Sequence, residues 1–456
     1  MKQIQNRNND RMISEPVTGL ILRLAVPTIL SMLVTNIYNL VDAYFVGNLG
    51  TSASGAIGIV LSIQAVLQAF GFMFGHGAGG IISRKLGRGE VESASRYAST
   101  SFFASFFVGI LIEVFFLLWI EPSLYFLGCT DSILPYAKSY AKYIVIGAPF
   151  VTSSCTLNNI LRYEGKASLA MVGLVSGAVL NMAGDPFLMF VLGLGMDGAG
   201  ISTLVSQVIS FWLLLFMFIS GKSTTKIKAR LVSLRPHETL RIMQNGFPSL
   251  IRQGLSSVST MMLNQSASVY GDAAIAAMSI VGRITMFIGA IVIGLGQALQ
   301  PVAAYNYGAA QYRRVKQAFT SAFWIAEGFL FVLLIAAYLV AGGVIRVFQE
   351  DPDVVRIGSV ALRLQCLGMI LQPLTVYANM MFQCVGKSML ASVLASLRSG
   401  IYFIPAILLL PKWMGLPGVQ SAQTIADLLT ALTALPFVLL FLRKLERYAK
   451  EMNRTT

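Results

Sequence analysis

The sequence predicts an all-α integral membrane protein with twelve transmembrane helices in two similar halves of six. Three observations support this class. Only 12% of the 456 residues are charged and 55% are hydrophobic, whereas a soluble domain has about 25% charged residues. Basic residues collect in alternate loops between apolar stretches. Glycine and proline positions in the first half recur in the second at a nearly constant offset.

The apolar stretches define the helices, because a transmembrane helix needs about 20 mostly apolar residues. The chain before Pro16 is polar, and the first apolar stretch is long and lacks an A-x-A-type cleavage site, so we expect it to be retained as a signal anchor. The twelve predicted spans are 20–46, 54–80, 97–120, 137–160, 168–193, 198–220, 240–269, 273–302, 317–341, 355–383, 389–411 and 417–442.

The basic residues predict the orientation of these spans. Loops that an N-inside model places in the cytoplasm hold most of the 34 lysines and arginines, including those of the basic segment between Gly221 and Arg235. The opposite loops and helix ends hold only Lys138, Lys142, Arg346, Arg356 and Lys412. By the positive-inside rule, both termini are predicted to be cytoplasmic and the protein to reside in the cell membrane.

An internal repeat divides the chain. An offset of 221 residues relates Pro27 to Pro248, Gly50 to Gly271 and Asn158 to Asn379. Such matches are significant because glycine and proline determine backbone geometry. We therefore predict an N-terminal six-helix bundle over residues 1–220, a cytoplasmic linker over 221–236, and a C-terminal six-helix bundle with a basic cytoplasmic tail over 237–456. With six spans each, the halves insert in the same orientation, as in transporters with parallel repeats.

Composition also argues against other functions. The net charge of +14 is explained by the cytoplasmic loops, so no nucleic-acid partner is predicted. The four cysteines form no CxxC pair, and only His76 and His237 are present, so neither a disulfide framework nor a histidine-rich metal site is expected. A membrane-embedded enzyme would need a nucleophile–base pair or a metal cluster, and the sequence shows neither. No cofactor is predicted.

Two carboxylates are the main candidates for a functional site, because charged residues within the bilayer are costly. Asp42 lies deep in the first span, and Tyr38 precedes it by one turn on the same helix face. Asp185 follows Asn181 by one turn in the fifth span, and Pro186 is expected to bend the helix there. Carboxylate, amide and freed carbonyl oxygens in one place favour a proton or cation site.

The second half lacks this pair of carboxylates. At the repeat offset Asp42 falls on Leu263, and the Asp185–Pro186 step corresponds to Ile404–Pro405. Isolated charges lie at Glu113 in the first half and at Glu327 and Asp427 in the second, and we expect them to contribute less to a functional site. The carboxylate chemistry is therefore predicted to lie in the N-terminal half. Pro27 cannot donate its amide, so the first helix is expected to flex near it.

The order and spacing of these motifs resemble the multidrug and toxic compound extrusion family over nearly the whole chain. The motifs are Pro27, Asp42 with Phe45-Val46-Gly47, the loop from Ser83 to Gly89, Arg162 with Gly165-Lys166, Asn181 with Asp185-Pro186, and Gly195 with Gly198. The resemblance implies two pseudo-symmetric bundles around a central cavity. It also implies a secondary antiporter that exports cationic or amphipathic organic compounds in exchange for protons or sodium ions. We expect the protein to be a monomer.

Individual residue roles follow from the same resemblance. In one branch of the family, a proton or sodium ion is bound by residues that match Asp42, Asn181, Asp185 and Thr203, with a nearby tyrosine that matches Tyr140. Thr35, Tyr38 and Asn158 are expected to contact substrate, and Pro27 and Pro186 to act as hinges. One alternative is a lipid-linked oligosaccharide flippase of the same superfamily; another is a membrane-embedded enzyme.

Overall fold

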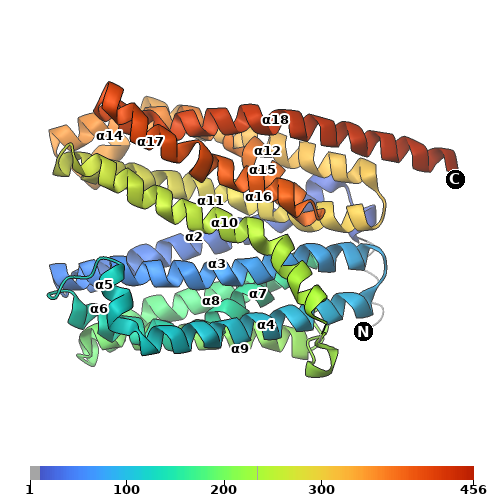
Figure 1. Cartoon of the computed structure of the whole chain (residues 1–456), viewed down its shortest axis with the longest axis horizontal. Helices are drawn as coiled ribbons and strands as arrows, with labels where there is room; N and C mark the ends of the chain where they lie inside the picture. Colours follow the sequence, from blue (N-terminus) through green and yellow to red (C-terminus); the bar gives the residue numbers. More distant parts are fainter. Residues whose placement is uncertain (1–10, 234, 456) are drawn as a thin grey trace. The chain divides into compact units, whose positions relative to one another are not determined.

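The computed structural model describes residues 11–233 and 235–455, with side chains to residue 452. Residues 1–10 and 456, which the topology prediction places in the cytoplasm, lie outside the described part. The first half contains α2 (Val17–Gly47), α3 (Thr51–Gly87), α4 (Val91–Leu118), α5 (Ile120–Phe126), α6 (Leu134–Ile146), α7 (Ala148–Tyr163), α8 (Ala167–Pro186), the π segment η1 (Phe187–Val191) and α9 (Gly195–Ile219) (Figure 1).

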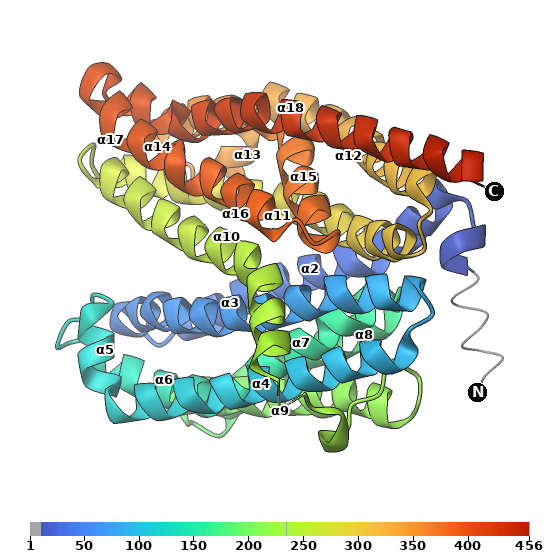
Figure 2. The same ribbon diagram turned by 45° about the vertical axis from the view of Figure 1, so that its right-hand side comes forward.

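The second half repeats this order. After the short 3-10 turn η2 (Ala229–Leu231), it contains α10 (Pro236–Ser268), α11 (Asp272–Gly308), α12 (Tyr312–Leu339), α13 (Ala341–Phe348), α14 (Pro352–Met369), α15 (Gln372–Cys384), α16 (Ser388–Ser396), the π segment η3 (Leu397–Ile401), α17 (Phe403–Met414) and α18 (Leu416–Thr455) (Figure 2).

Every predicted span falls on helix, and the chain is a multi-pass membrane protein. Within the described residues, nine uninterrupted spans are long and apolar enough to cross a membrane, and two more are formed by bent pairs. The pairs α6–α7 and α14–α15 bend by 52° and 48°. Each second helix has proline in its first turn, at Pro149 and Pro373. A proline at this position costs no helical hydrogen bond, because the first N–H groups of a helix have no helical acceptor.

The seventh predicted span, residues 240–269, is helical but more polar than the others. It belongs to α10, which has 33 residues and is therefore long enough to cross a bilayer. It does not meet the apolar criterion that the other eleven satisfy. Polar residues such as Arg252, Gln253 and Asn264 lower its hydropathy.

The internal repeat is confirmed by matching elements and contacts. Helices α3 and α11 each have 37 residues, and α4 and α12 each have 28. The glycines before α3 and α11 both have positive φ, 117° at Gly50 and 92° at Gly271. Asn158 Nδ2 donates to the Ala170 carbonyl at 2.9 Å, and Asn379 Nδ2 donates to the Ala391 carbonyl at 2.5 Å. The same residue types therefore join equivalent helices in both halves.

The chain folds into two compact units, one built around Leu24–Leu250 and one formed by Glu15–Arg23 and Ile251–Thr456. The predicted linker, residues 221–236, belongs to the first unit. The buried Glu164 carboxylate accepts hydrogen bonds from Ser223, Thr224 and Thr225, so this segment is attached to the first unit. The boundary between the units lies within α10, at Leu250–Ile251.

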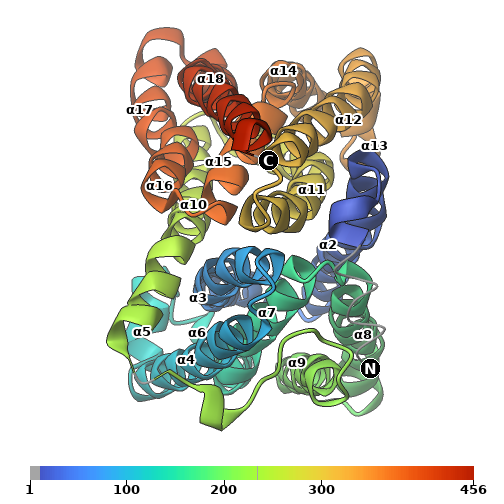
Figure 3. The same ribbon diagram turned by 90° about the vertical axis from the view of Figure 1, so that its right-hand side faces the viewer.

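Small residues bring α3 and α7 into close contact in the first unit. A Cβ atom on Gly71 would lie 2.6 Å from Cys155 Cβ, one on Gly75 would lie 2.8 Å from Asn159 Cβ, and one on Gly79 would lie 2.1 Å from the Tyr163 ring. These glycines are spaced by four residues and form one face of α3, which is the usual device for close helix packing in a membrane. Figure 3 views many of these helices end-on.

Candidate cation site

The predicted cation-site residues come together within the first unit. Asp42 lies on α2, Tyr140 on α6, Asn181 and Asp185 on α8, and Thr203 on α9. All five are buried, with Asp42 the most accessible at 4%. Four helices therefore contribute to one buried polar cluster.

A continuous set of contacts joins the two carboxylates. Tyr140 Oη donates to Asp42 Oδ2 at 3.2 Å and lies 3.5 Å from Thr203 Oγ1. Asn181 Nδ2 lies 3.1 Å from both Thr203 Oγ1 and Asp185 Oδ1. The Thr203 hydroxyl donates to the Ala199 carbonyl at 3.0 Å. Since its single proton is used there, the Thr203 oxygen faces the cluster as an acceptor.

Three buried oxygen atoms in the cluster have no hydrogen-bond donor among the described residues: Asp42 Oδ1, Asn181 Oδ1 and Asp185 Oδ2. An unsatisfied buried acceptor costs about 1–3 kcal/mol, and more when it is charged. The cluster contains two carboxylates and no basic side chain. Asp42 is also close enough to act on Asp185 electrostatically. This arrangement is suited to receive positive charge, from either a proton or a cation with oxygen ligands.

Local backbone features on α8 shape the cluster. Pro186 has no N–H to donate to the Met182 carbonyl, and the π segment η1 begins at the next residue. A π segment thus follows Pro186 directly, and such segments are frequent at functional sites. Bending of the helix at Pro186 stays a prediction. Gly184 allows α9 to approach, since a Cβ there would lie 2.5 Å from Ser202 Oγ.

Two further polar residues belong to this region and were not predicted from the sequence. Ser202 Oγ lies 3.3 Å from Asn181 Nδ2 and donates to the Asn181 carbonyl. Gln64 Nε2, on α3, donates to Tyr38 Oη at 3.2 Å. A serine beside Thr203 and a buried glutamine in an apolar span were the available sequence signals. Their contribution depends on helix packing, which sequence spacing alone does not determine.

The predicted substrate contacts have different surroundings. Tyr38 is half-buried and lies one turn before Asp42, and half-buried Thr35 donates to the Ser31 carbonyl at 2.8 Å. Asn158 is 7% exposed, and its amide joins α7 to α8 through the Ala170 carbonyl. A structural role for Asn158 is therefore evident, and substrate binding by these three residues stays a prediction.

The predicted hinge residue Pro27 lies inside an uninterrupted α2. The chain passes from the second unit to the first between Arg23 and Leu24. Pro27 has no N–H to donate to the Arg23 carbonyl, so the missing helical hydrogen bond lies at this boundary. Pro248 lies similarly close to the boundary at Leu250–Ile251 in α10. The paired prolines therefore mark the two helices that pass between units.

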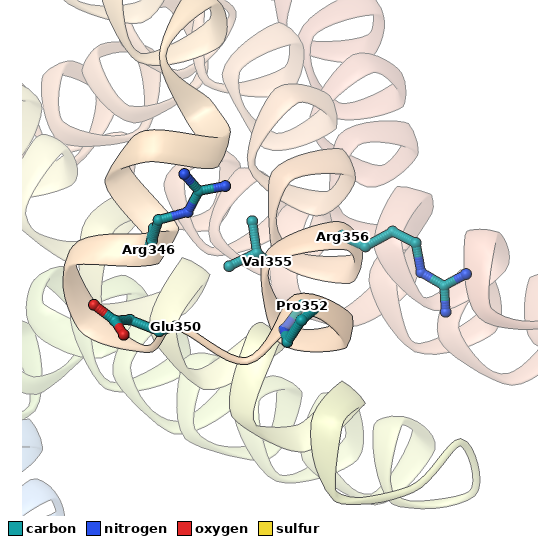
Figure 4. Close-up of a pocket in the computed structure, with 5 residues that line it drawn as sticks. All are labelled: Arg346, Glu350, Pro352, Val355 and Arg356. Atoms are coloured by element: carbon teal, nitrogen blue, oxygen red, sulfur yellow. The ribbon is translucent and has the colours of Figure 1, made fainter.

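A surface pocket in the second unit is separate from this cluster. Arg346, Glu350, Pro352, Val355 and Arg356 line it, at the connection between α13 and α14. Figure 4 shows Arg356 pointing away from the pocket, and its guanidinium pairs with Asp353 at 2.9 Å. The predicted site residues all lie in the other unit.

Comparisons with known proteins agree with the two-fold repeat. The family model described as MatE matches the chain twice, over residues 27–187 and 248–408. Over 426 residues the chain is 28% identical to the multidrug export protein MepA of Staphylococcus haemolyticus, covering 92% of this chain and 93% of that protein. It is 27% identical to MepA of Staphylococcus aureus strain MSSA476, covering 93% and 94%.

Solved structures show the same fold. A structure described as the outward-facing conformation of a multidrug resistance MATE family transporter of the MOP superfamily aligns with a TM-score of 0.90 and 25% identity. The alignment covers 96% of this chain and 98% of that one. A MOP superfamily transporter from Pyrococcus furiosus aligns equally well, with a TM-score of 0.90 and 25% identity over 96% and 98% of the two chains.

Proposed function

Because the chain belongs to the MatE family of multidrug and toxic compound extrusion transporters, we propose that it is a secondary antiporter which exports cationic or amphipathic organic compounds in exchange for a proton or a sodium ion. Relatives named as multidrug export proteins support this substrate class. They favour a transporter over an enzyme. The proposed orientation, with both termini in the cytoplasm of the cell membrane, rests on the distribution of basic residues.

The observation that carries the proposed coupling is the set of three buried oxygens without donors, Asp42 Oδ1, Asn181 Oδ1 and Asp185 Oδ2. One bound proton would convert a carboxylate into a donor, and one sodium ion would be coordinated by several oxygens at once. Either would offset the repulsion between the two carboxylates. Thr203 Oγ1 adds a neutral oxygen beside Asn181.

Exchange follows if the coupling ion and the substrate stabilise different conformations. A ligand shifts a conformational equilibrium only by its differential affinity for the two states. An ion bound at Asp42 and Asp185 would favour the conformation in which α2, α8 and α9 enclose it. A cationic substrate that competes for the same negative charge would favour another. Bending of α2 near Pro27 and of α10 near Pro248 would allow the change.

The proposal can be tested with purified protein in liposomes. We expect an imposed proton or sodium gradient to drive transport of a cationic dye against its concentration gradient, and the effective gradient identifies the ion. Asp185→Asn should abolish this driven transport. Asp197→Asn is the matched control, because Asp197 lies in the same unit but pairs with Lys142 at 2.9 Å and is 43% exposed. Normal driven transport in Asp185→Asn vesicles would refute the proposed coupling site.

A further inference from the structure

A second charged pair lies within the membrane-spanning part of the second unit. Arg398 belongs to the π segment η3, and its Nε donates to Asp427 Oδ1 on α18 at 2.6 Å. Gln423 Nε2 donates to the same oxygen at 3.0 Å. The Asp427 carboxylate is buried, with 2% of its side chain exposed, whereas Arg398 is 31% exposed.

The pair lies deep in its spans. Arg398 follows Ser388, the first residue of the span Ser388–Met414, by ten residues, which is about 15 Å of helix. Asp427 lies a similar distance along α18, eleven residues after Leu416. The hydrocarbon core of a bilayer is about 30 Å thick, so both estimates place the pair near its centre. A lipid headgroup at the membrane surface would not reach this depth.

The guanidinium of Arg398 has N–H groups that are not used in its bond to Asp427. Arginine has five N–H groups, and the bond to Asp427 uses the one on Nε. Within the described part of the chain, the two terminal amino groups of Arg398 make no hydrogen bond. An arginine at this depth normally faces the protein interior or a water-filled cavity, because exposure of its charge to lipid is costly. The exposed part of Arg398 is therefore accessible to a polar ligand.

The neighbouring helix also presents a hydrophilic surface. The segment η3 packs on α10, where Ser259 Oγ donates to the Ser399 carbonyl at 2.6 Å and Leu255 contacts Gly400. Beside this contact, α10 has a polar stripe, defined as Gln253, Ser256, Ser257, Thr260 and Asn264. All of these except half-buried Gln253 are exposed. A polar exposed stripe at membrane depth indicates contact with water rather than with lipid.

We propose that Arg398 is a substrate-binding residue that accepts the carboxylate of amphipathic compounds, with the polar stripe of α10 providing a hydrated surface beside it. Asp427 holds the guanidinium by Nε and leaves its terminal amino groups to form paired hydrogen bonds with the ligand carboxylate. This inference rests on the proposed export function and extends its substrates to zwitterionic compounds.

The test compares a carboxylate-bearing rhodamine dye with its methyl ester, which has the same ring system without the anionic group. Binding of both dyes to purified protein is measured by fluorescence polarisation without any ion gradient. We expect the double variant Arg398→Gln/Asp427→Asn to weaken binding of the acid about tenfold relative to the ester, as loss of charge-assisted hydrogen bonds predicts. The double variant avoids leaving Asp427 as an unpaired buried charge, which would destabilise the fold.

Two further variants make the test specific. Arg398→Lys retains the charge but not the paired donors, and we expect an intermediate loss of preference for the acid. Arg363→Gln is the matched control, because Arg363 is an exposed arginine of the same unit that bonds to the Tyr338 carbonyl near the end of α12, and it should leave the acid-to-ester ratio unchanged.

An unchanged acid-to-ester ratio in the double variant, or an equal loss of both dyes, would overturn the role of Arg398. Failure of the proposed export function would be seen separately, as absence of gradient-driven dye transport by the unaltered protein.

Discussion

The substitution Asp42→Asn is the most direct test of the polar cluster that contains Asp42 and Asp185. Asparagine has nearly the same shape as aspartate, and its carbonyl oxygen can still accept the hydrogen bond from Tyr140 that Asp42 Oδ2 accepts at 3.2 Å. What is lost is one of the two negative charges, together with the carboxylate oxygen that has no donor. The fold should tolerate this change, since removing an unpaired buried charge relieves a desolvation cost.

The expected effect on cation binding is large. A carboxylate about 4 Å from a bound cation contributes about 4 kcal/mol at an effective dielectric constant of about 20. Loss of that contribution corresponds to a roughly thousandfold decrease in ion affinity, because about 1.4 kcal/mol equals a factor of ten. At physiological ion concentrations such a decrease would leave the site largely empty, and gradient-driven exchange should stop.

The assay uses liposomes that contain equal amounts of unaltered or Asp42→Asn protein, with dye transport followed after a proton or sodium gradient is imposed. Thermal unfolding of the purified variant verifies that it is folded. Glu327→Gln provides a matched control, since Glu327 is a half-buried carboxylate in the second unit, and we expect little change. If Asp42→Asn retains more than about a tenth of the driven transport, the Coulomb argument is wrong and the coupling site lies elsewhere.

Three further predictions follow from the same structure. Pro27→Ala and Pro248→Ala each restore a helical N–H and should lower transport more than expression, as shown by transport rate per molecule; unchanged rates would exclude hinges there. In a cysteine-free protein, the cysteine of Ala229→Cys should resist impermeant thiol reagents added outside intact cells, and ready labelling would refute a cytoplasmic location of the 221–236 segment. Ala229 is exposed and therefore suits this labelling, whereas Ser223 is buried. Glu164→Gln should lower the free energy of unfolding by about 1.5–3 kcal/mol, because it weakens charge-assisted bonds to the 223–225 segment; an unchanged denaturation midpoint would contradict this.

Much of the architecture was predictable because membrane spans obey a local rule. The bilayer thickness sets the length of an apolar helix, so each span could be located without knowledge of its neighbours. The repeat was equally accessible, since Gly50 and Gly271 begin equivalent helices with positive φ. Within the candidate site, Asp42, Asn181 and Asp185 were identifiable because charged and amide side chains are costly in lipid.

Other features depend on contacts between residues distant in sequence. Only the packing of five helices revealed the roles of Ser202 and Gln64. The same packing joins Asp42 to Asp185 through Tyr140, Asn181 and Thr203. The pairing of Arg398 with Asp427 spans 29 residues, and nothing in the sequence links the two.

The sequence by itself therefore determined the membrane class, the helices, the repeat and the residue types available for chemistry. These properties follow from hydropathy and backbone stereochemistry, which act over a few residues at a time. Only the tertiary structure decided which polar atoms are paired and which are left without donors. That outcome depends on helix rotation and close approach, as at Gly184, where the absence of a Cβ allows Ser202 to reach Asn181.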